Sequence, residues 1–298
     1  MPNPSLPPEI LDYIVDLLQG NSKPLKECCL VSKSWILRTR KHLFAEVRLD
    51  AEEDLISWKE IFPDPTTSPA HHAETLYVGC LHVVTPADAD ASGWIAGFSR
   101  VVNLKLDAYN AYLENAEAFL VPFHGLSPTI KSLSVYLAVL PPSQLLNLIL
   151  SFPLLEDLTL IGDDPSTRNI DGPDGLSTII QPSNPPALTG SLELHLGVRI
   201  RPIVHRLLSL PGGVHFQDLT LTACDEEDHL LVVALLEECS YTLESLDICY
   251  DLIRTPIWHL RPRRSLTSVP SWVEVSFDRP LEGNKTQGCD LWNRFMGC

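Results

Sequence analysis

The chain has 298 residues, 45% of them hydrophobic, and a formal net charge of −16 at pH 7. This length allows two domains, or one small module followed by an elongated one, and the hydrophobic content excludes global disorder. Residues 1–50 are nearly neutral, with seven Lys/Arg and six Asp/Glu, whereas the remainder carries 15 and 32. Such an acidic body argues against nucleic-acid binding, because attraction to phosphate dominates that affinity. The acidity serves solubility or, as the alternative, a preference for basic partners.

The eight cysteines are expected to be reduced, mostly as small hydrophobic residues of the core. No C-x-x-C pair occurs, and a chain of this size does not need disulfides to fold. The N-terminus lacks a basic region followed by an apolar run, and no apolar run reaches 18 residues. We therefore expect neither a secretory signal nor a membrane span, and predict a cytoplasmic protein, a nuclear one, or both.

Three short helices are predicted within residues 5–44. Ser5 can cap the first of them, and proline suits its first turn because the missing N–H has no intrahelical partner there. One apolar face recurs at helical spacing and comprises Ile10, Ile14, Leu17 and Leu18. We expect Gly20-Asn21 to end this helix, Pro24 to begin the second, and Ser32 or Ser34 to cap the third. A module of this size buries little surface. Part of its apolar surface must therefore cover a neighbouring domain or a partner.

Two segments of this module carry a family resemblance, Leu6-Pro7-x-Glu9-Ile10 and Leu30-Val31-Ser32-Lys33-Ser34-Trp35. In this order and spacing they resemble the F-box, with serine where that family commonly has cysteine. The resemblance implies docking to a Skp-type adaptor, which links F-box proteins to a cullin scaffold in a ubiquitin ligase. Carried over by position, the adaptor-binding residues are Leu6, Pro7, Glu9, Ile10, Ile14, Leu18, Val31 and Trp35. The alternative is an ordinary helical cap that closes the next domain, with Trp35 in the core.

A short alternating pattern recurs after this module. Residues 46–60 are expected to join the two parts, and 62–69 to form a loop. Apolar and other residues then alternate with the period of a β-strand at 76–78, 104–106, 133–135, 158–160, 192–194, 219–221, 246–248 and 273–275. The first members of these segments are 28, 29, 25, 34, 27, 27 and 27 residues apart. A repeat of this length predicts a stack of similar units.

Helical patterns lie between the strand segments, at 141–153, 203–213 and 225–240. One strand–loop–helix unit cannot close its own core, so neighbouring units must stack. The pattern L-x-x-L-x-L in several units resembles the irregular leucine-rich repeats that often follow an F-box, although the family's Asn or Cys after the strand is clear only at Cys224. The predicted fold class is therefore α/β (α+β): an N-terminal three-helix F-box-like module followed by an irregular leucine-rich-repeat solenoid of short parallel strands and helices.

In such a solenoid, the strand residues beside the leucines face the concave surface and are candidates for target contact. This resemblance gives the candidate substrate-binding residues Lys105, Asp107, Tyr136, Asp157, Glu193, His195, Asp218 and Asp247. The alternative for each residue is an ordinary solvated position on the sheet. The long step of 34 residues contains an insertion at 162–190, which we predict to be an exposed loop.

The domain prediction has three parts: an F-box-like helical module over 1–46, the leucine-rich-repeat-like solenoid over 47–253, and an atypical or poorly ordered tail over 254–298. This tail is rich in arginine, proline and tryptophan and only weakly periodic. It either covers the open end of the solenoid with its tryptophans or is a flexible solvated segment.

Motifs of common enzyme classes are missing, among them G-x-S-x-G, G-x-x-x-x-G-K-[ST], G-x-G-x-x-G and H-E-x-x-H. His71-His72 has no third ligand nearby, and 163–175 lacks the ligand spacing of an EF-hand, so we expect neither metal nor cofactor. The sequence predicts a non-catalytic substrate-recognition subunit of a Skp–cullin–F-box ubiquitin ligase. Its partners would be a Skp-type adaptor, a cullin through that adaptor, and a protein target, with no nucleic acid and no membrane. The alternatives are a repeat scaffold in a complex outside ubiquitination, and an enzyme whose residues are scattered over the repeats.

Overall fold

The protein is described by a computed structural model that covers residues 7–80, 83–107, 120–137, 142–162, 186, 188–194, 200–222, 229–249 and 274–276. Within these residues, three helices precede a single parallel sheet with further helices. The N-terminal helices are α1 (Pro8–Asp16), α2 (Ser22–Val31) and α3 (Lys33–Leu43). The combination of helices with one parallel sheet confirms the predicted α/β class at this coarse level.

Nine strands among the described residues form one sheet, in which the spatial order follows the chain order from β1 to β9. All neighbouring strands are parallel. They are β1 (Glu46–Leu49), β2 (Thr75–Val78), β3 (Asn103–Asp107), β4 (Ser132–Leu137), β5 (Asp157–Gly162), β6 (Ser191–Leu194), β7 (Asp218–Thr222), β8 (Ser245–Cys249) and β9 (Glu274–Ser276). Because parallel neighbours require a crossover connection, each return segment must cross a face of the sheet.

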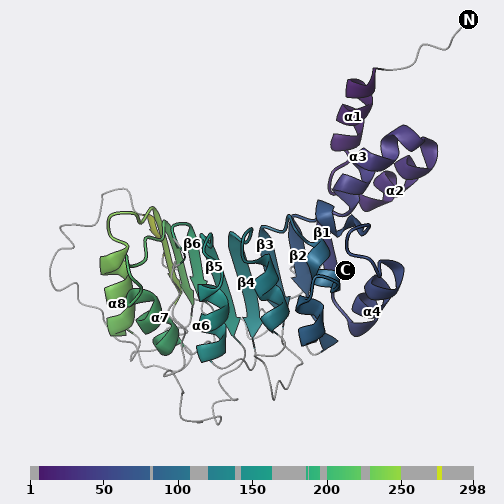
Figure 1. Cartoon of the computed structure of the whole chain (residues 1–298). Coiled ribbons are helices and arrows are strands. Elements are labelled where there is room, and N and C mark those ends of the chain that lie inside the picture. The colour runs from purple at the N-terminus through teal and green to yellow at the C-terminus, as the bar shows by residue number, and fades with distance from the viewer. Residues whose placement is uncertain are drawn as a thin grey trace, which may run out of the picture.

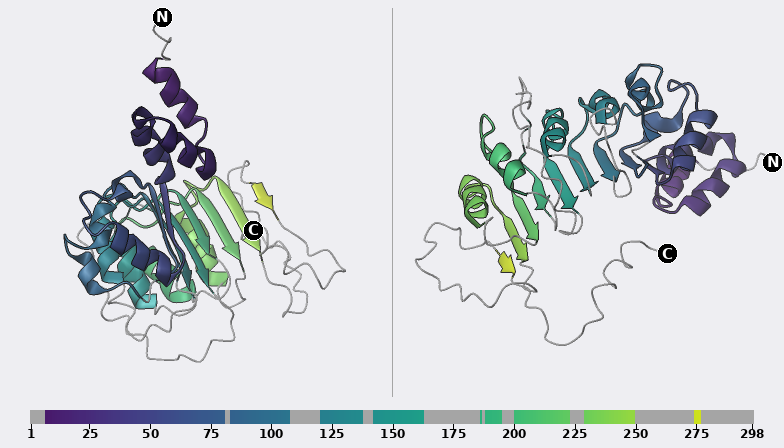
Figure 2. Two further views of the ribbon diagram at one scale, coloured as in Figure 1. Left: turned by 90° about the vertical axis from the view of Figure 1, so that its right-hand side faces the viewer. Right: turned by 90° about the horizontal axis from the view of Figure 1, so that it is seen from below.

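The return segments lie on one face of this curved sheet, which is its convex face (Figures 1 and 2). The α-helices among them are α4 (Glu52–Ile61), α6 (Pro142–Leu150), α7 (Ile200–Leu208) and α8 (His229–Glu238). Short 3₁₀ helices serve the earlier returns, namely η1 (Pro69–His72), η3 (Pro86–Ala89), η4 (Trp94–Gly97) and η5 (Val121–Leu126). No described helix covers the opposite, concave face, while α1–α3 lie beyond the β1 end of the sheet (Figure 1).

Rows of apolar side chains on the convex side form the core. Leu76, Leu104 and Leu133 are lateral partners in neighbouring strands, and all three are fully buried. Phenylalanines from the return segments pack in the same core, including the fully buried Phe98 and Phe123. The period-two pattern of the strands therefore buries one face of the sheet and leaves the residues between the leucines on the other face.

The joint between the helices and the sheet is short and aromatic. Only two residues separate the end of α3 at Leu43 from the start of β1 at Glu46. Phe44 packs edge-on against Trp58 and Phe62 of the α4 region, with ring centroids 6.3 and 6.4 Å apart. Trp58 also contacts Phe98 of the sheet core at 5.5 Å. A short connection anchored by an aromatic cluster restricts the motion of the helices relative to the sheet.

Several local predictions are confirmed. Ser32 is the N-cap of α3 and accepts a hydrogen bond from the Ser34 backbone N–H at 3.3 Å. Gly20 lies in the left-handed region, with φ +83°, in the turn that follows α1. The helices predicted at 141–153, 203–213 and 225–240 correspond to α6, α7 and α8. Ser5, Cys224, most of the tail and all of 163–185 lie outside the described residues.

Two predictions about whole segments were wrong, and α2 begins at Ser22, two residues before the predicted Pro24. The segment 46–60 is not a simple connection, because it contains the first strand, β1, and most of α4. The insertion at 162–190 is not wholly an exposed loop, because Leu188 is fully buried and its N–H donates to the Leu155 carbonyl at 3.0 Å. In both places apolar side chains pack into the core, Val47 and Leu49 from the first segment and Leu188 from the second.

The two faces of the sheet predict opposite mutational sensitivities on one strand. Leu133→Ala leaves a cavity in a fully buried row and should lower the free energy of unfolding by about 2–5 kcal/mol. Ser134→Ala, the matched control on the other face of β4, should change it by no more than about 0.5 kcal/mol. Urea denaturation followed by circular dichroism measures both. Equal losses in the two variants would contradict the assignment of the faces.

Candidate functional site

The described part of the N-terminal helices displays an unusual amount of apolar surface. Seven large apolar side chains there have exposed fractions between 37% and 88%: Ile10, Tyr13, Ile14, Leu17, Leu30, Val31 and Leu37. We call these seven residues the apolar surface. Exposed apolar residues scattered singly are normal, whereas their concentration in one small module is typical of a protein interaction site.

The first helix presents its apolar face to solvent. Ile10, Tyr13, Ile14 and Leu17 follow one another at the i, i+3, i+4 and i+7 spacing of a single helical face, and all four are exposed. Val15 points the other way and is only 1% exposed. Because this apolar face of α1 points to solvent, its burial does not contribute to the stability of the domain. A partner that covered the face would supply that free energy of burial.

Most residues of the predicted adaptor site lie on or beside this surface. Ile10, Ile14 and Val31 belong to it, and Pro7 and Glu9 are exposed at the start of α1. Leu18 and Trp35 are only half-buried, so each has a role in packing with part of its surface still accessible. Leu6 lies outside the described residues. The sequence prediction omitted Tyr13, Leu17, Leu30 and Leu37, although the helical spacing of Leu17 with Ile10 was a usable signal.

A charged network holds α1 against α3. Arg38 donates from Nε to Asp16 Oδ1 at 2.6 Å and from Nη2 to Asp16 Oδ2, and His42 Nε2 lies 2.7 Å from Oδ1. The hydrogen bonds from Arg38, and then from His42, hold the pKa of the Asp16 carboxyl well below its ordinary value. Two charge-assisted contacts on one carboxylate fix the angle at which α1 presents its apolar face.

The concave face of the sheet carries the second set of predicted residues. Lys105, Asp107, Tyr136, Asp157 and Glu193 are half-buried positions of β3–β6, while Asp218 and Asp247 are exposed on β7 and β8. Their lateral register brings them into rows across the strands. His195 lies outside the described residues. The structure thus collects seven of these predicted side chains on one face that no described helix covers (Figure 2).

One end of this face contains a network that the sequence did not reveal. The Arg48 guanidinium lies over the Tyr77 ring at 4.5 Å from its centroid and donates to Asp50 at 3.0 Å. Tyr77 donates its hydroxyl hydrogen to Asp107 at 2.8 Å. Burial, followed by this hydrogen bond, raises the pKa of the Tyr77 phenol above its ordinary value. Arg48 and Tyr77 are lateral neighbours only because β1 pairs with β2, and the sequence did not predict β1.

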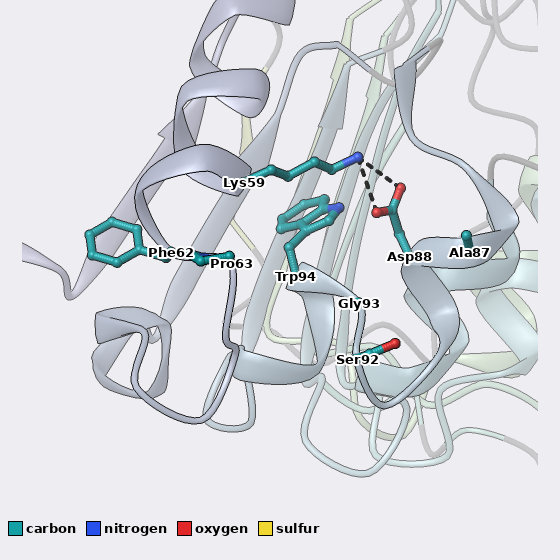
Figure 3. A pocket seen from close by; sticks show the side chains of 8 residues that line it. All are labelled: Lys59, Phe62, Pro63, Ala87, Asp88, Ser92, Gly93 and Trp94. Atoms are coloured by element: carbon teal, nitrogen blue, oxygen red, sulfur yellow. Dashed lines mark hydrogen bonds and ion pairs between the residues drawn. The ribbon is translucent and has the colours of Figure 1, made fainter.

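A small cavity of about 290 Å³ lies between α4 and the η3–η4 segment (Figure 3). Lys59 extends across it to Asp88, with Nζ at 3.0 and 3.1 Å from the two carboxylate oxygens. Asp88 also accepts a hydrogen bond from the Thr85 backbone N–H at 2.8 Å. The lining residues include no histidine or cysteine. This ion pair closes a return segment onto α4, which is a structural role.

The described cysteines behave as core residues. Cys28, Cys80 and Cys239 are buried, Cys29 is half-buried, and these four residues are free thiols. Burial raises the pKa of the Cys80 and Cys239 thiols to about 11, so both are protonated at neutral pH and poor nucleophiles. Over the described ranges, no three His, Cys, Asp or Glu side chains gather as a metal site, His71-His72 included.

Two further searches, for a membrane-spanning helix in the described part of the chain and for similar proteins, gave no match. Among the described residues, no helix is both long and apolar enough to cross a bilayer. A scan against models of protein families found no match, and neither did searches of curated proteins and of solved structures. Function must therefore be inferred from the residues and their geometry.

The Asp16 network predicts how α1 can be loosened without changing its apolar face. Asp16→Asn keeps the shape but removes the charge that Arg38 contacts, so amide hydrogen exchange in α1 should become faster. The pKa of Asp16 is lower in the folded protein than in the unfolded one. Its contribution to the stability of the folded state is therefore complete at pH values above the unfolded pKa of about 3.9, and disappears as the pH falls through the folded pKa. Hydrogen exchange at pH 7, followed by mass spectrometry, therefore measures the full effect.

Asp12→Asn is the control for this experiment, because it removes an exposed carboxylate of the same helix that acts on Arg38 through its charge but does not contact it by a hydrogen bond. Exchange in α1 should remain close to that of the unchanged protein. Equal acceleration in the two variants would mean that general helix charge, rather than the contact with Arg38 and His42, holds α1 in place.

Proposed function

We propose that this protein is the substrate-recognition subunit of a Skp–cullin–F-box ubiquitin ligase. Its N-terminal helices would dock to a Skp-type adaptor, and the concave face of its sheet would bind a protein target. The observation that carries the proposal is the exposed apolar surface on α1–α3, which includes Ile10, Ile14 and Val31 of the adaptor-binding residues that the F-box resemblance implies. No residue of this chain need perform chemistry.

The energetics of the apolar surface support docking. Fully burying an exposed Leu or Ile side chain contributes about 1.5–3 kcal/mol, so a few such contacts supply the core of a specific interface. Tyr13, 62% exposed, adds an aromatic residue of the kind that dominates such interfaces. A merely capping module would turn this surface toward the sheet, yet these side chains are exposed in the structure.

The sheet supports the leucine-rich-repeat interpretation. Chain-ordered parallel strands with one lateral row of apolar residues, buried from Val47 on β1 to Leu219 on β7, are what a solenoid of such repeats requires. Curvature then creates an extended concave surface, which repeat proteins use for binding. We therefore place the target on the face that carries Lys105, Tyr136, Glu193 and their neighbours.

The proposed mechanism is catalysis by proximity. A target held on the sheet is brought near a ubiquitin-charged enzyme that the adaptor and cullin position, which converts an encounter in solution into a reaction within one assembly. The short aromatic joint at Phe44 would preserve the direction in which the target is presented. The gain in rate then depends on geometry rather than on an acid, base or nucleophile in this chain.

The test is co-purification with a Skp-type adaptor, followed by calorimetric titration. Ile10→Asp/Ile14→Asp should weaken binding at least about 100-fold, since each buried contact supplies about 1.5 kcal/mol or more and 1.4 kcal/mol corresponds to a factor of ten. The matched control is Ile56→Asp/Ile61→Asp, which makes the same change at two exposed positions of α4. That control should bind as the unchanged protein does.

Failure of the folded, unchanged chain to bind the adaptor would overturn the ligase proposal. Equal weakening by the two double variants would also count against it, because the effect would not depend on α1. Adaptor binding without ubiquitination of any captured target in a reconstituted ligase would favour the scaffold outside ubiquitination.

A further inference from the structure

Four consecutive strands each place one carboxylate on the concave face. These residues are Asp157 on β5, Glu193 on β6, Asp218 on β7 and Asp247 on β8. Ser191 pairs laterally with Asp218 and donates to Asp157, which puts both aspartates in one row. Glu193 and Asp247 share the next row, through Thr220. The carboxylates therefore alternate between two rows, one per strand.

This alternation gives a regular spacing across the strands. Within each row, the carboxylates are two strands apart, which is about 9.6 Å at the usual separation of about 4.8 Å. An extended polyproline-type segment advances about 3.1 Å per residue, or about 9.3 Å for three residues. Two cations three residues apart on such a segment therefore match the two carboxylates of one row.

Hydroxyl and backbone donors orient two of these carboxylates. Asp157 Oδ1 accepts from the Ser191 backbone N–H at 2.7 Å and from the Ser191 hydroxyl at 3.0 Å. Glu193 Oε2 accepts from the Thr159 hydroxyl at 3.1 Å. Such bonds restrict rotation, so less conformational entropy is lost when a cation binds.

The surroundings on this part of the face are acidic and aromatic. Strands β5–β8 contain no lysine or arginine, since the described cations of the face, Arg48 and Lys105, lie on β1 and β3. Tyr136 adjoins on β4, and burial, followed by the charges of Glu193 and Asp107, raises its pKa. Arg48 over Tyr77 shows that a tyrosine of this sheet can hold a guanidinium against its ring.

We propose that the concave face of β4–β8 binds an extended, lysine- or arginine-rich segment of a partner protein, with cations about three residues apart. The segment crosses the strands, two cations three residues apart pair with the two carboxylates of one row, and another cation or an apolar residue rests on Tyr136. This inference rests on the proposed function in taking the concave face as the target surface, and it adds the chemical class of the target.

The probe is a fluorescent peptide of four Lys-Pro-Ser repeats, whose lysines recur every third residue and whose prolines favour the extended form. Fluorescence anisotropy with the full chain should detect binding at 50 mM salt that weakens at least about tenfold at 500 mM, because salt screens these pairs. A peptide of the same composition with its four lysines adjacent should bind at least about threefold more weakly, since it has one pair of lysines three residues apart where the repeating peptide has three.

The variant Glu193→Gln/Asp218→Asn/Asp247→Asn should reduce affinity for the repeating peptide at least about tenfold. All three changes are nearly isosteric, and the amide oxygen that replaces the Glu193 carboxylate can still accept the Thr159 hydrogen bond. The control Glu60→Gln/Asp90→Asn/Glu237→Gln removes three charges from exposed positions outside the strands and should bind as the unchanged chain does. Circular dichroism verifies that both triple variants fold.

Absence of peptide binding, or equal binding by the triple variant, would overturn the proposal. Equal loss in the control would also overturn it, because net charge alone would then explain the affinity. The adaptor titration is an independent readout, since neither triple variant changes α1–α3. Adaptor binding without peptide binding therefore rejects this inference and keeps the proposed function, whereas the reverse result rejects the ligase and leaves a binder of basic segments.

Discussion

The lateral register of the leucine rows is the constraint on which the rest of the structure depends. Leu133 on β4 faces Leu104 and Leu158 in the neighbouring strands, and all three are fully buried. Because successive strand residues alternate between faces, a shift of one residue would expose this row and bury its polar neighbours. The same register that builds the core therefore also assigns Ser134 and Thr159 to the concave face.

The N-terminal helices obey a different constraint. The sheet buries nearly every apolar residue of its rows, whereas α1 leaves Ile10, Tyr13 and Ile14 in solvent. Its opposite face holds the buried Val15 and the half-buried Leu11, and Asp16 joins it to α3 through Arg38 and His42. A helix held by a few specific contacts, with its apolar face outward, is stable enough to keep its position and still has interaction energy available for a partner.

The repeats were predictable because their signal is local and recurs. Alternation at 104–106 or 158–160 identifies a strand without knowledge of its neighbours, and the structure has β3 and β5 there. β1 was missed although Val47 and Leu49 alternate in the same way, because it is short, charged and lies before the first clear repeat. Exposure was harder to predict: Leu37 and Leu43 have equal hydrophobicity on one helix, and only the packing of α3 decides which is exposed.

The connection between the two candidate surfaces is short and well packed. Proximity helps a reaction only when the linkage holds its ends in a productive geometry, since a long flexible connection dilutes the local concentration. Here Ala45, the residue before β1, accepts hydrogen bonds from the Glu74 and Thr75 backbone N–H groups at 2.8 and 3.0 Å, while Phe44 packs into the aromatic cluster. The two residues between α3 and β1, Phe44 and Ala45, are therefore both held by contacts with the sheet domain. A partner on α1 and a segment on β4–β8 would be separated by a framework of fixed geometry, so the length of the target between its bound segment and its reactive lysine would determine which lysine is modified.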